Sequence, residues 1–358
     1  MKKILFGMLF LLPVLAKTQD ISAKADAYIK AYAAQNKFSG NILIAKNDKI
    51  IFRKSAGFAS LENHQLVNDA TTFRIGSLTK MFTAALVLHA AENQLLSLDA
   101  PVSRYITILS YGDSVTIRQL LSHSSGISGN TQPNAKDLQT LVSGFAAGPV
   151  KFRPGTKFDY NNFNFILLSY ILEKIYAQPF AVILQTKILG PAGMKSSGLD
   201  SAGRPADNAA TGYTIDPATN KWVPATDPEI QQAYGAGAMY ATTEDLLLWS
   251  AFIRNGRFIS HSLLQEAMRI VHADYGLGWI IRNMQAHPMA GHTGTVRGFN
   301  AASMHFPKDS FTVIYTSNFQ DMDVARFANN LYALALSLPY EMPVFKKMML
   351  LKNWRQQN

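Results

Sequence analysis

Segments with the alternating pattern of β-strands lie near both ends of this 358-residue chain, and helical patterns fill the middle. Near the N-terminus, Asn41–Ala45 and Lys49–Lys54 are predicted to be two strands joined by a hairpin turn through Asn47 and Asp48. Three further strands are predicted in the last third, at Gly278–Arg282, Ala301–Phe306 and Phe311–Ser317. Strands from both ends with helices between them predict one sheet that the two ends build together.

Apolar residues recur at helical spacing in the segments between and beyond these strands. Phe165, Leu168 and Ile171, for example, share one face of a helix. The predicted helices span residues 21–35, 77–93, 116–122, 162–176, 243–254 and 321–336. Residues 201–229 are rich in Pro, Asp, Ala, Thr and Asn, and predict long loops with one small hairpin near Asp216, Pro217 and Asn220.

The fold class that follows is α/β, and more closely α+β. We expect an antiparallel sheet flanked by helices, with an inserted and mostly helical subdomain. The sheet part is expected at about residues 20–75 and 265–340 and the helical part at about 76–264, which together form one domain over residues 20–340. Ser77 falls at the first boundary between the two parts. Clefts between such parts are favoured places for binding sites.

The first sixteen residues have the pattern of a secretory signal peptide. Lys2 and Lys3 precede an apolar run at residues 4–12, and Val14–Ala16 offers small residues for cleavage. The run is short for a membrane span, although an uncleaved anchor is the alternative. No later segment has about eighteen uninterrupted apolar residues, so we expect no stable membrane insertion after signal cleavage. The mature protein is therefore expected to be periplasmic or secreted.

The chain is basic, with 34 Lys and Arg against 24 Asp and Glu, and it has no cysteine. Its basic residues are dispersed, apart from a basic C-terminal tail at residues 341–358. We find no basic segment interleaved with aromatic residues, so nucleic acid is not an expected partner. Association with anionic cell-envelope polymers stays open. Disulfides and thiolate metal sites are excluded, and without metal-ligand spacing or a phosphate loop we expect no metal and no cofactor.

Ser77 and Lys80 stand three residues apart in the segment Gly76-Ser-Leu-Thr-Lys80. On a helix such a pair points the same way, with Cβ atoms about 5–6 Å apart. At a helix start the Ser77 oxygen would lie near the positive end of the helix dipole, which favours developing negative charge. Burial of Lys80 would lower its pKa, so that a neutral amine takes the serine proton. The alternative is a helix-capping serine beside a solvent-facing lysine.

Three ordered motifs resemble those of the penicillin-recognising serine hydrolases. Phe73–Lys80 is similar to the motif that holds their S-x-x-K nucleophile signature. Tyr160–Asn162 matches Y-x-N, and His292–Gly294 stands where these proteins have K-T-G or H-x-G. Further similar segments are Leu120–Gly126, Arg153–Gly155, Gly235–Gly237 and Gly298–Phe299. The similarity spans roughly residues 25–335, and it implies a β-lactamase/transpeptidase-like fold in a family of class C β-lactamases, D,D-peptidases, D-aminopeptidases and related esterases.

The resemblance makes Tyr160 a candidate general base for attack and acid for the leaving group. A neighbouring lysine can hold a tyrosine as phenolate, or the phenol can relay a proton. Without Ser77 and Lys80, an aromatic residue packed on the core would be the better interpretation. The Asn162 amide has two possible roles. It can bridge Lys80 and a substrate carbonyl, or it can cap the following helix, since Asn is a preferred N-cap.

His292, Thr293 and Gly294 are expected on the strand that lines the cleft. Gly294 would let a substrate backbone approach closely, since it has no side chain. By the family pattern, the backbone N–H groups of Ser77 and Thr295 form the oxyanion hole. The role of His292 follows chiefly from the resemblance, because a histidine in a strand is more often structural than catalytic.

A lysine at position 292 would carry a full charge and hold the carboxylate of a β-lactam or a peptide C-terminus. Histidine, with an unperturbed pKa near ~6.5, is mostly neutral at pH 7 and clamps a carboxylate weakly, unless Arg297 takes that place. We therefore expect an exported serine hydrolase that forms an acyl-enzyme on Ser77. Its expected substrates are small esters, amides or D-amino-acid peptides, with weak or no β-lactamase activity. The alternatives are a penicillin-acylated sensor without turnover and a true β-lactamase. His123 is interpreted as a structural hydrogen-bonding residue rather than a base.

Overall fold

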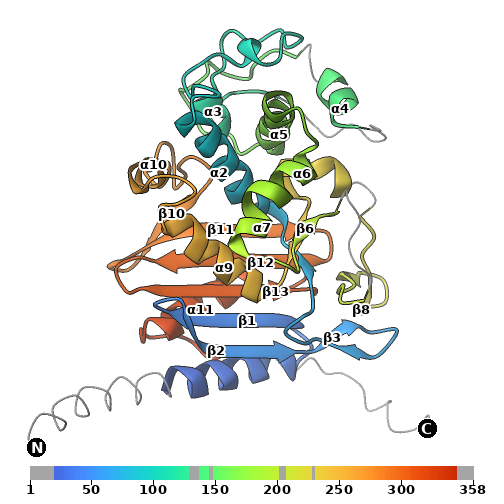
Figure 1. The fold of residues 1–358 in the computed structure, drawn as a ribbon. Coiled ribbons are helices and arrows are strands. Elements are labelled where there is room, and N and C mark those ends of the chain that lie inside the picture. Colours follow the sequence, from blue (N-terminus) through green and yellow to red (C-terminus); the bar gives the residue numbers. More distant parts are fainter. Residues whose placement is uncertain (1–19, 129–136, 145–147, 201–206, 228–229, 345–358) are drawn as a thin grey trace, which may run out of the picture.

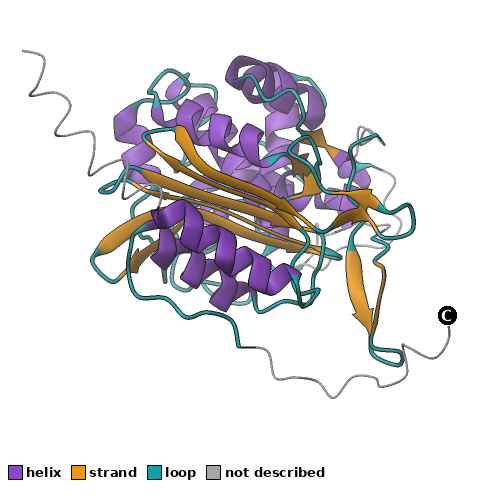
Figure 2. Ribbon diagram, turned by 90° about the horizontal axis from the view of Figure 1, so that it is seen from below, coloured by secondary structure: helices purple, strands orange, loops and turns teal. Residues whose placement is uncertain are grey.

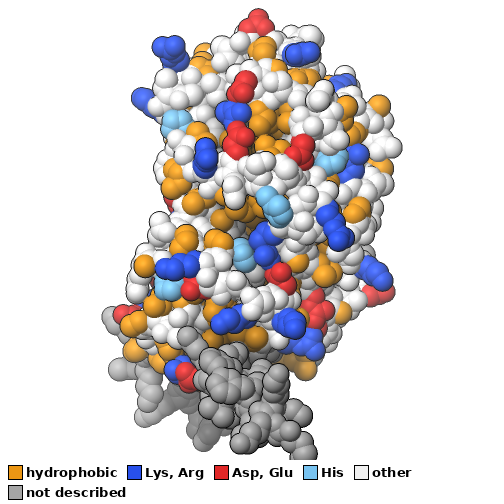
Figure 3. Space-filling view, turned by 60° about the vertical axis from the view of Figure 1, so that its left-hand side comes forward, with side chains coloured by type: hydrophobic (Ala, Val, Ile, Leu, Met, Phe, Trp, Pro, Cys, Tyr) orange, Lys and Arg blue, Asp and Glu red, His pale blue; other side chains and the backbone are white. Residues whose placement is uncertain are grey.

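A computed structural model describes residues 20–128, 137–144, 148–200, 207–227 and 230–344. The expected signal peptide and most of the expected basic tail lie outside these residues. On the face drawn in Figure 3, basic and acidic side chains lie scattered among apolar and uncharged ones. This distribution agrees with the dispersed charges of the sequence.

One six-stranded antiparallel sheet is built from both ends of the chain, as predicted (Figure 1). Its strands, in spatial order, are β10 (Ile280–Met284), β11 (His287–Val296), β12 (Phe299–Phe306), β13 (Phe311–Ser317), β1 (Gly40–Lys46) and β2 (Lys49–Ala56). The two ends meet where β1 pairs with β13, from Gly40 opposite Ser317 to Lys46 opposite Phe311. The β1–β2 turn has Asn47 at φ 50° and Asp48 at φ 60°, the left-handed conformation that a two-residue hairpin requires.

Two helices cover one face of this sheet (Figure 2). They are the helix at residues 20–33 and α11 (Val324–Ala335), so they also come from opposite ends of the chain. Aromatic rings join them: Phe327 on α11 lies 5.7 Å from the ring of Tyr28 and stacks on Phe38 at 5.1 Å. This layer therefore closes one core between helices and sheet.

The opposite face carries α2 (Thr79–Glu92), whose residues are almost all buried. The helix is apolar on all sides because α5 (Asn162–Tyr176), α8 (Tyr234–Gly237) and other elements enclose it. Phe82 on α2 stacks on Trp249 of α9 (Thr243–Arg254), with ring centroids 4.1 Å apart. The position of α2 is thus fixed by packing on every side.

Shorter elements complete the helical part and the edges of the sheet. The helices are α3 (Ile117–Leu121), α4 (Leu138–Gly144), α6 (Phe180–Leu184), α7 (Gly190–Ala192) and α10 (His261–Ala267), with helical turns η1 (Gly76–Leu78), η2 (Val102–Arg104), η3 (Gln185–Leu189) and η5 (Ile230–Ala233). The short strands are β3 (Phe58–Ser60), β4 (Gln65–Leu66), β5 (Phe73–Arg74), β6 (Gly198–Leu199), β7 (Tyr213–Asp216), β8 (Lys221–Pro224) and β9 (Met239–Ala241). Within the described residues, no single helix is long and apolar enough to cross a membrane. Two consecutive helical segments, Asn162–Tyr176 and Phe180–Ala192, reach the length and apolar composition of a membrane span only when they are taken together, and they are bent by 80° relative to each other.

Most predicted elements are found within a few residues of their expected bounds, and the small hairpin near Asp216 is confirmed as β7–β8. Several boundaries differ by two or three residues, and the structure gives details for two of them. The helix expected from Ser77 begins as the 3₁₀ turn η1, and α2 starts only at Thr79. The strand expected from Gly278 begins at Ile280, because Gly278 has φ 95° and an added Cβ would lie 2.4 Å from the Cβ of Ala84.

We expect Phe82→Ala to lower the free energy of unfolding by about 3–5 kcal/mol, because it leaves a cavity between α2 and α9. Urea denaturation followed by circular dichroism measures the change. The control Leu66→Ala removes a side chain that is 63% exposed and should change stability by less than about 0.5 kcal/mol. A loss below about 1 kcal/mol for Phe82→Ala would contradict this account of the packing.

Candidate active site

Ser77 lies in the turn η1, where the chain passes from β5 into α2, and strand β11 runs closely alongside. Gly76 has φ 52°, a conformation that favours glycine. An added Cβ on Gly294 would lie 2.0 Å from the carbonyl oxygen of Ile75 and 2.9 Å from the Ser77 nitrogen. The close approach at Gly294 is therefore to the chain's own backbone, where we had expected a substrate backbone.

Lys80 is fully buried and its amino group reaches three oxygen atoms. Its Nζ lies 2.9 Å from Ser77 Oγ, 2.8 Å from Asn162 Oδ1 and 2.7 Å from the carbonyl oxygen of Ala236. Burial lowers the pKa of Lys80 well below its ordinary value. The solvent-facing lysine that the sequence left open is thus excluded.

Both protonation states of the amine can make these three contacts, and an ammonium donates to all three oxygens, Ser77 Oγ included. The neutral amine, which burial favours, keeps two of these hydrogen bonds as a donor. The Asn162 and Ala236 oxygens can only accept, so they take the two N–H bonds of an uncharged Nζ. The remaining lone pair then faces the Ser77 hydroxyl, which can donate to it. The arrangement can therefore remove the serine proton without any further base.

Tyr160 lies at the mouth of the site, beside Lys80 and Ser77. Nζ of Lys80 is 4.9 Å from the centre of the Tyr160 ring. Burial of the phenol by surrounding protein raises its pKa, and a hydrogen bond with Ser77 opposes this shift. Tyr160 is 42% exposed at the mouth of the site, and the net effect on its phenol is a raised pKa. It favours the protonated phenol over the phenolate, so the proton-relay role fits the structure better.

Asn162 is the first residue of α5, and its neighbour caps the helix. Oδ1 of Asn161 accepts the N–H of Phe163 at 2.9 Å, which makes Asn161 the N-cap. Oδ1 of Asn162 is then free to accept from Lys80. The capping role considered for Asn162 is wrong, and its amide belongs to the site.

His292 lies on β11 and is only 2% exposed. Its Nδ1 lies 2.5 Å from the carbonyl oxygen of Thr293, which is half-buried on the same strand, and its Nε2 lies 2.9 Å from the Tyr275 hydroxyl. Since a carbonyl only accepts, the ring proton sits on Nδ1, and the tyrosine donates to Nε2. Burial is the main cause that lowers the pKa of His292 to about 3, and Lys80 contributes to the shift when it is charged. The imidazole is neutral and supplies no positive charge.

Thr295 places its backbone N–H toward η1. The β11–β12 hairpin closes with Val296 opposite Phe299, so Thr295 and Asn300 form the next pair, whose N–H groups point away from each other. The Thr295 nitrogen lies 3.1 Å from where a Cβ on Gly76 would stand. The N–H groups of Ser77 and Thr295 are thus neighbours at this edge of β11. Arg297 is exposed in the turn and makes no ion pair with any described residue.

Two contact residues were missed by the sequence reasoning. The Gly235–Gly237 segment was recognised as similar to the family, but nothing in it indicates that the Ala236 carbonyl binds Lys80. Tyr275 has no signal in the sequence at all, because its role depends on long-range packing against His292. Among the described residues, no three His, Cys, Asp or Glu side chains gather in a way that could hold a metal ion.

Comparison of the chain with known proteins identifies its family. The model of the family described as Beta-lactamase matches residues 25–337. The chain belongs to the Beta-lactamase family. It is a serine hydrolase of that family, with the fold that the resemblance implied.

Two relatives come from Bacillus subtilis (strain 168). The putative penicillin-binding protein PbpX is 27% identical over 321 residues, which cover 89% of this chain and 79% of the relative. Penicillin-binding protein 4* is 26% identical over 313 residues, covering 79% of this chain and 69% of the relative.

Solved structures share the fold at lower identity. The octameric penicillin-binding protein homologue from Pyrococcus abyssi has a TM-score of 0.76 at 24% identity, with 88% of this chain and 77% of that chain covered. The D-amino acid amidase from Ochrobactrum anthropi SV3, complexed with D-phenylalanine, has a TM-score of 0.75 at 19% identity, with 90% and 99% covered.

Acylation should rise with pH through the lowered pKa of Lys80, because only the neutral amine accepts the serine proton. We expect Lys80→Met to slow acylation about 10²–10⁴-fold and to abolish this pH dependence. A pH–rate profile of kcat/KM for p-nitrophenyl acetate measures both effects. Lys30→Met, at an exposed position on the helix at residues 20–33, is the control and should keep the wild-type profile. An unchanged profile in Lys80→Met would contradict the role of the buried amine.

Proposed function

We propose that the chain is an exported hydrolase that cleaves small esters, amides or D-amino-acid peptides through an acyl-enzyme on Ser77. The observation that carries the proposal is the buried Nζ of Lys80, 2.9 Å from Ser77 Oγ and bound to two further acceptors. A serine hydroxyl is a weak nucleophile until a base removes its proton. The export rests on the signal-peptide pattern of the first sixteen residues.

In the first step, Ser77 Oγ bonds to the substrate carbonyl carbon while its proton moves to Nζ of Lys80. The carbonyl electron pair moves onto oxygen, which is held by the N–H groups of Ser77 and Thr295. The bond to the leaving group then breaks, and that group takes the hydroxyl proton of Tyr160. The ammonium of Lys80 returns a proton to the phenolate. Water repeats the sequence on the acyl-enzyme, releases the acid and restores Ser77.

The substrate class follows from the absence of a fixed charge at His292. A neutral imidazole that is already bonded to Tyr275 and to the Thr293 carbonyl binds a carboxylate weakly. Arg297 is exposed in the turn after β11, where solvent and salt screen its charge. Substrates without an essential carboxylate, such as short esters and amides, therefore fit the site best. The amidase from Ochrobactrum anthropi, which shares the fold, supports this class.

Ser77→Ala should lower kcat by at least about 10³-fold on every substrate that the wild type cleaves. The panel is p-nitrophenyl acetate, D-alanine amide, a D-alanyl peptide and a chromogenic cephalosporin. Ser143→Ala, on the exposed face of α4, is the control. Intact-mass measurement should show an acyl adduct only when Ser77 is present. Full activity of Ser77→Ala, or a stable adduct without turnover on all four substrates, would contradict the proposal.

Restoring a cation should change the substrate preference. We expect His292→Lys to raise the ratio of kcat/KM for the cephalosporin to that for p-nitrophenyl acetate about 10-fold, because a hydrogen bond to a charged group contributes about 1.5–3 kcal/mol. His64→Lys adds the same charge at an exposed turn and should leave the ratio unchanged. A wild-type ratio already above that of His292→Lys would show that the carboxylate clamp lies elsewhere.

A further inference from the structure

Tyr160 lies in a short loop before α5, and both of its chain neighbours are hydrogen-bonded to one residue, His123. The carbonyl oxygen of His123 accepts the N–H of Asp159 at 2.9 Å. Its Nδ1 accepts the N–H of Asn161 at 3.1 Å. The imidazole also packs on the phenol, with ring centroids 4.2 Å apart and the planes tilted by 32°. His123 therefore contacts the main chain on both sides of Tyr160 as well as its ring.

These contacts specify the protonation of His123. Because Nδ1 accepts a backbone N–H, it holds no proton, and the proton of the neutral ring is on Nε2. Nε2 is buried with no hydrogen-bond partner among the described residues. Tyr275 and Phe165 enclose the ring at centroid distances of 4.9 Å and 5.1 Å. Burial is the main cause that lowers the pKa of His123 well below its ordinary value, and Lys80 and His292 lower it further when they are charged.

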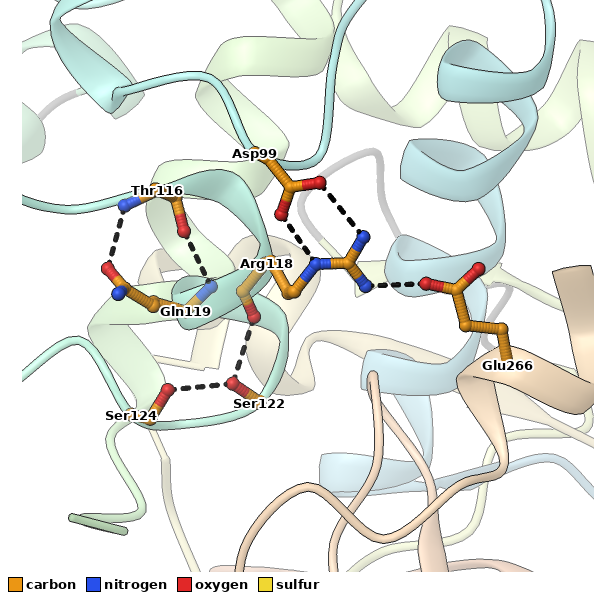
Figure 4. A network of polar contacts seen from close by, with 7 residues as sticks. All are labelled: Asp99, Thr116, Arg118, Gln119, Ser122, Ser124 and Glu266. Atoms are coloured by element: carbon orange, nitrogen blue, oxygen red, sulfur yellow. Dashed lines mark hydrogen bonds and ion pairs between the residues drawn. The ribbon is translucent and has the colours of Figure 1, made fainter. Parts of the chain in front are cut away.

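The segment that carries His123 is held in place by polar contacts (Figure 4). Thr116 and Gln119 form a capping box at the start of α3. The hydroxyls of Ser122 and Ser124, on either side of His123, lie 2.8 Å apart. Arg118 ties this helix to outside segments through Asp99 and Glu266. His123 itself has φ 53°, in the left-handed region. With this backbone conformation, both its carbonyl oxygen and its side chain reach the loop that contains Tyr160.

We propose that His123 is a positioning residue for Tyr160, which it holds with its phenol at Ser77 and Lys80 while a proton passes to the leaving group. His123 is fully buried, and the hydrogen bonds of its carbonyl and side chain within the described part of the chain go to Asp159, Asn161 and Asn164 rather than to Ser77, so it acts through Tyr160. The inference rests on the proposed function, because it assumes that Tyr160 protonates the leaving group. A displaced phenol would slow that transfer even when binding is intact.

Two substitutions separate the contacts of His123. Asn places Oδ1 where Nδ1 stands, so it keeps the acceptor for Asn161, tolerates the left-handed backbone and loses the ring. Phe keeps the ring and loses the acceptor. We expect each variant to lower kcat about 10-fold on D-alanine p-nitroanilide, and His123→Leu to lower it about 100-fold, with KM changed less than about 2-fold.

A comparison of leaving groups distinguishes positioning from a general loss of structure. p-Nitroaniline must be protonated as it leaves, whereas p-nitrophenolate leaves as a stable anion. The His123 variants should therefore slow the anilide much more than p-nitrophenyl acetate. In a Tyr160→Phe background, which has no hydroxyl to position, the same variants should change the anilide rate less than about 2-fold. Equal losses on both substrates, or equal losses in both backgrounds, would overturn the inference.

His64 offers matched controls away from the site, and Tyr160→Phe tests the proposed function separately. His64 has φ 51°, is exposed and meets an aromatic ring edge-on, so His64→Asn and His64→Phe repeat both substitutions away from the site. These controls should keep wild-type rates, and thermal melts should show all variants folded. If Tyr160→Phe itself keeps the wild-type anilide rate, the proposed proton role of Tyr160 fails. If Tyr160→Phe is slow while His123→Leu is not, only the positioning role fails.

Discussion

The burial of one amino group is the interaction on which the rest of the site depends. Lys80 has no exposed surface, and its Nζ is satisfied by Ser77, Asn162 and the Ala236 carbonyl. A buried ammonium without a carboxylate partner is costly, and among the described residues no acid approaches it. Burial therefore favours the neutral form of the amine, which is the form that the proposed mechanism requires. The packing of α2 between α5, α8 and α9 can be understood as the structure that keeps water away from it.

Close backbone approach is the second requirement. The nucleophile turn lies against β11, where Gly294 leaves no room for a Cβ and Gly76 has a φ of 52° that favours glycine. The sheet that presents β11 is joined between β13 and β1, so it forms only when both ends of the chain have come together. The site thus combines a helix from the middle of the chain with a strand whose position depends on both ends. Its geometry is a property of the whole fold rather than of any one segment.

Sequence patterns could predict what depends on neighbouring residues. Local spacing and turn chemistry predict the β1–β2 hairpin and the helices near residues 162–176 and 243–254. The same local spacing predicts that Ser77 and Lys80 lie together. The resemblance also indicated the contact between Lys80 and Asn162, but other contacts across the fold could not be predicted. The Ala236 carbonyl is a backbone atom whose residue type carries no information about its partner. Asn161 and Asn162 are adjacent, and either one satisfies the sequence pattern of a helix N-cap. Asn161 caps α5, while Asn162 accepts a hydrogen bond from Lys80, and this difference depends on where Lys80 lies.

Two buried histidines lie beside Lys80 and bear on the charge of the site. Lys80, His123 and His292 are all buried close together, and burial lowers the pKa of each. A charge on either imidazole would repel the proton that Lys80 must accept. With both imidazoles neutral, the first charges to appear are the ammonium of Lys80 and the oxyanion of the substrate, formed together and close to each other. Their attraction is stronger in this poorly solvated site than in water, so the same burial that keeps the resting amine neutral favours the charge-separated intermediate. A lysine at position 292 would add a carboxylate contact, but its charge would oppose protonation of Lys80. In the proposed mechanism, a neutral His292 therefore leaves Lys80 a stronger base at the expense of carboxylate binding.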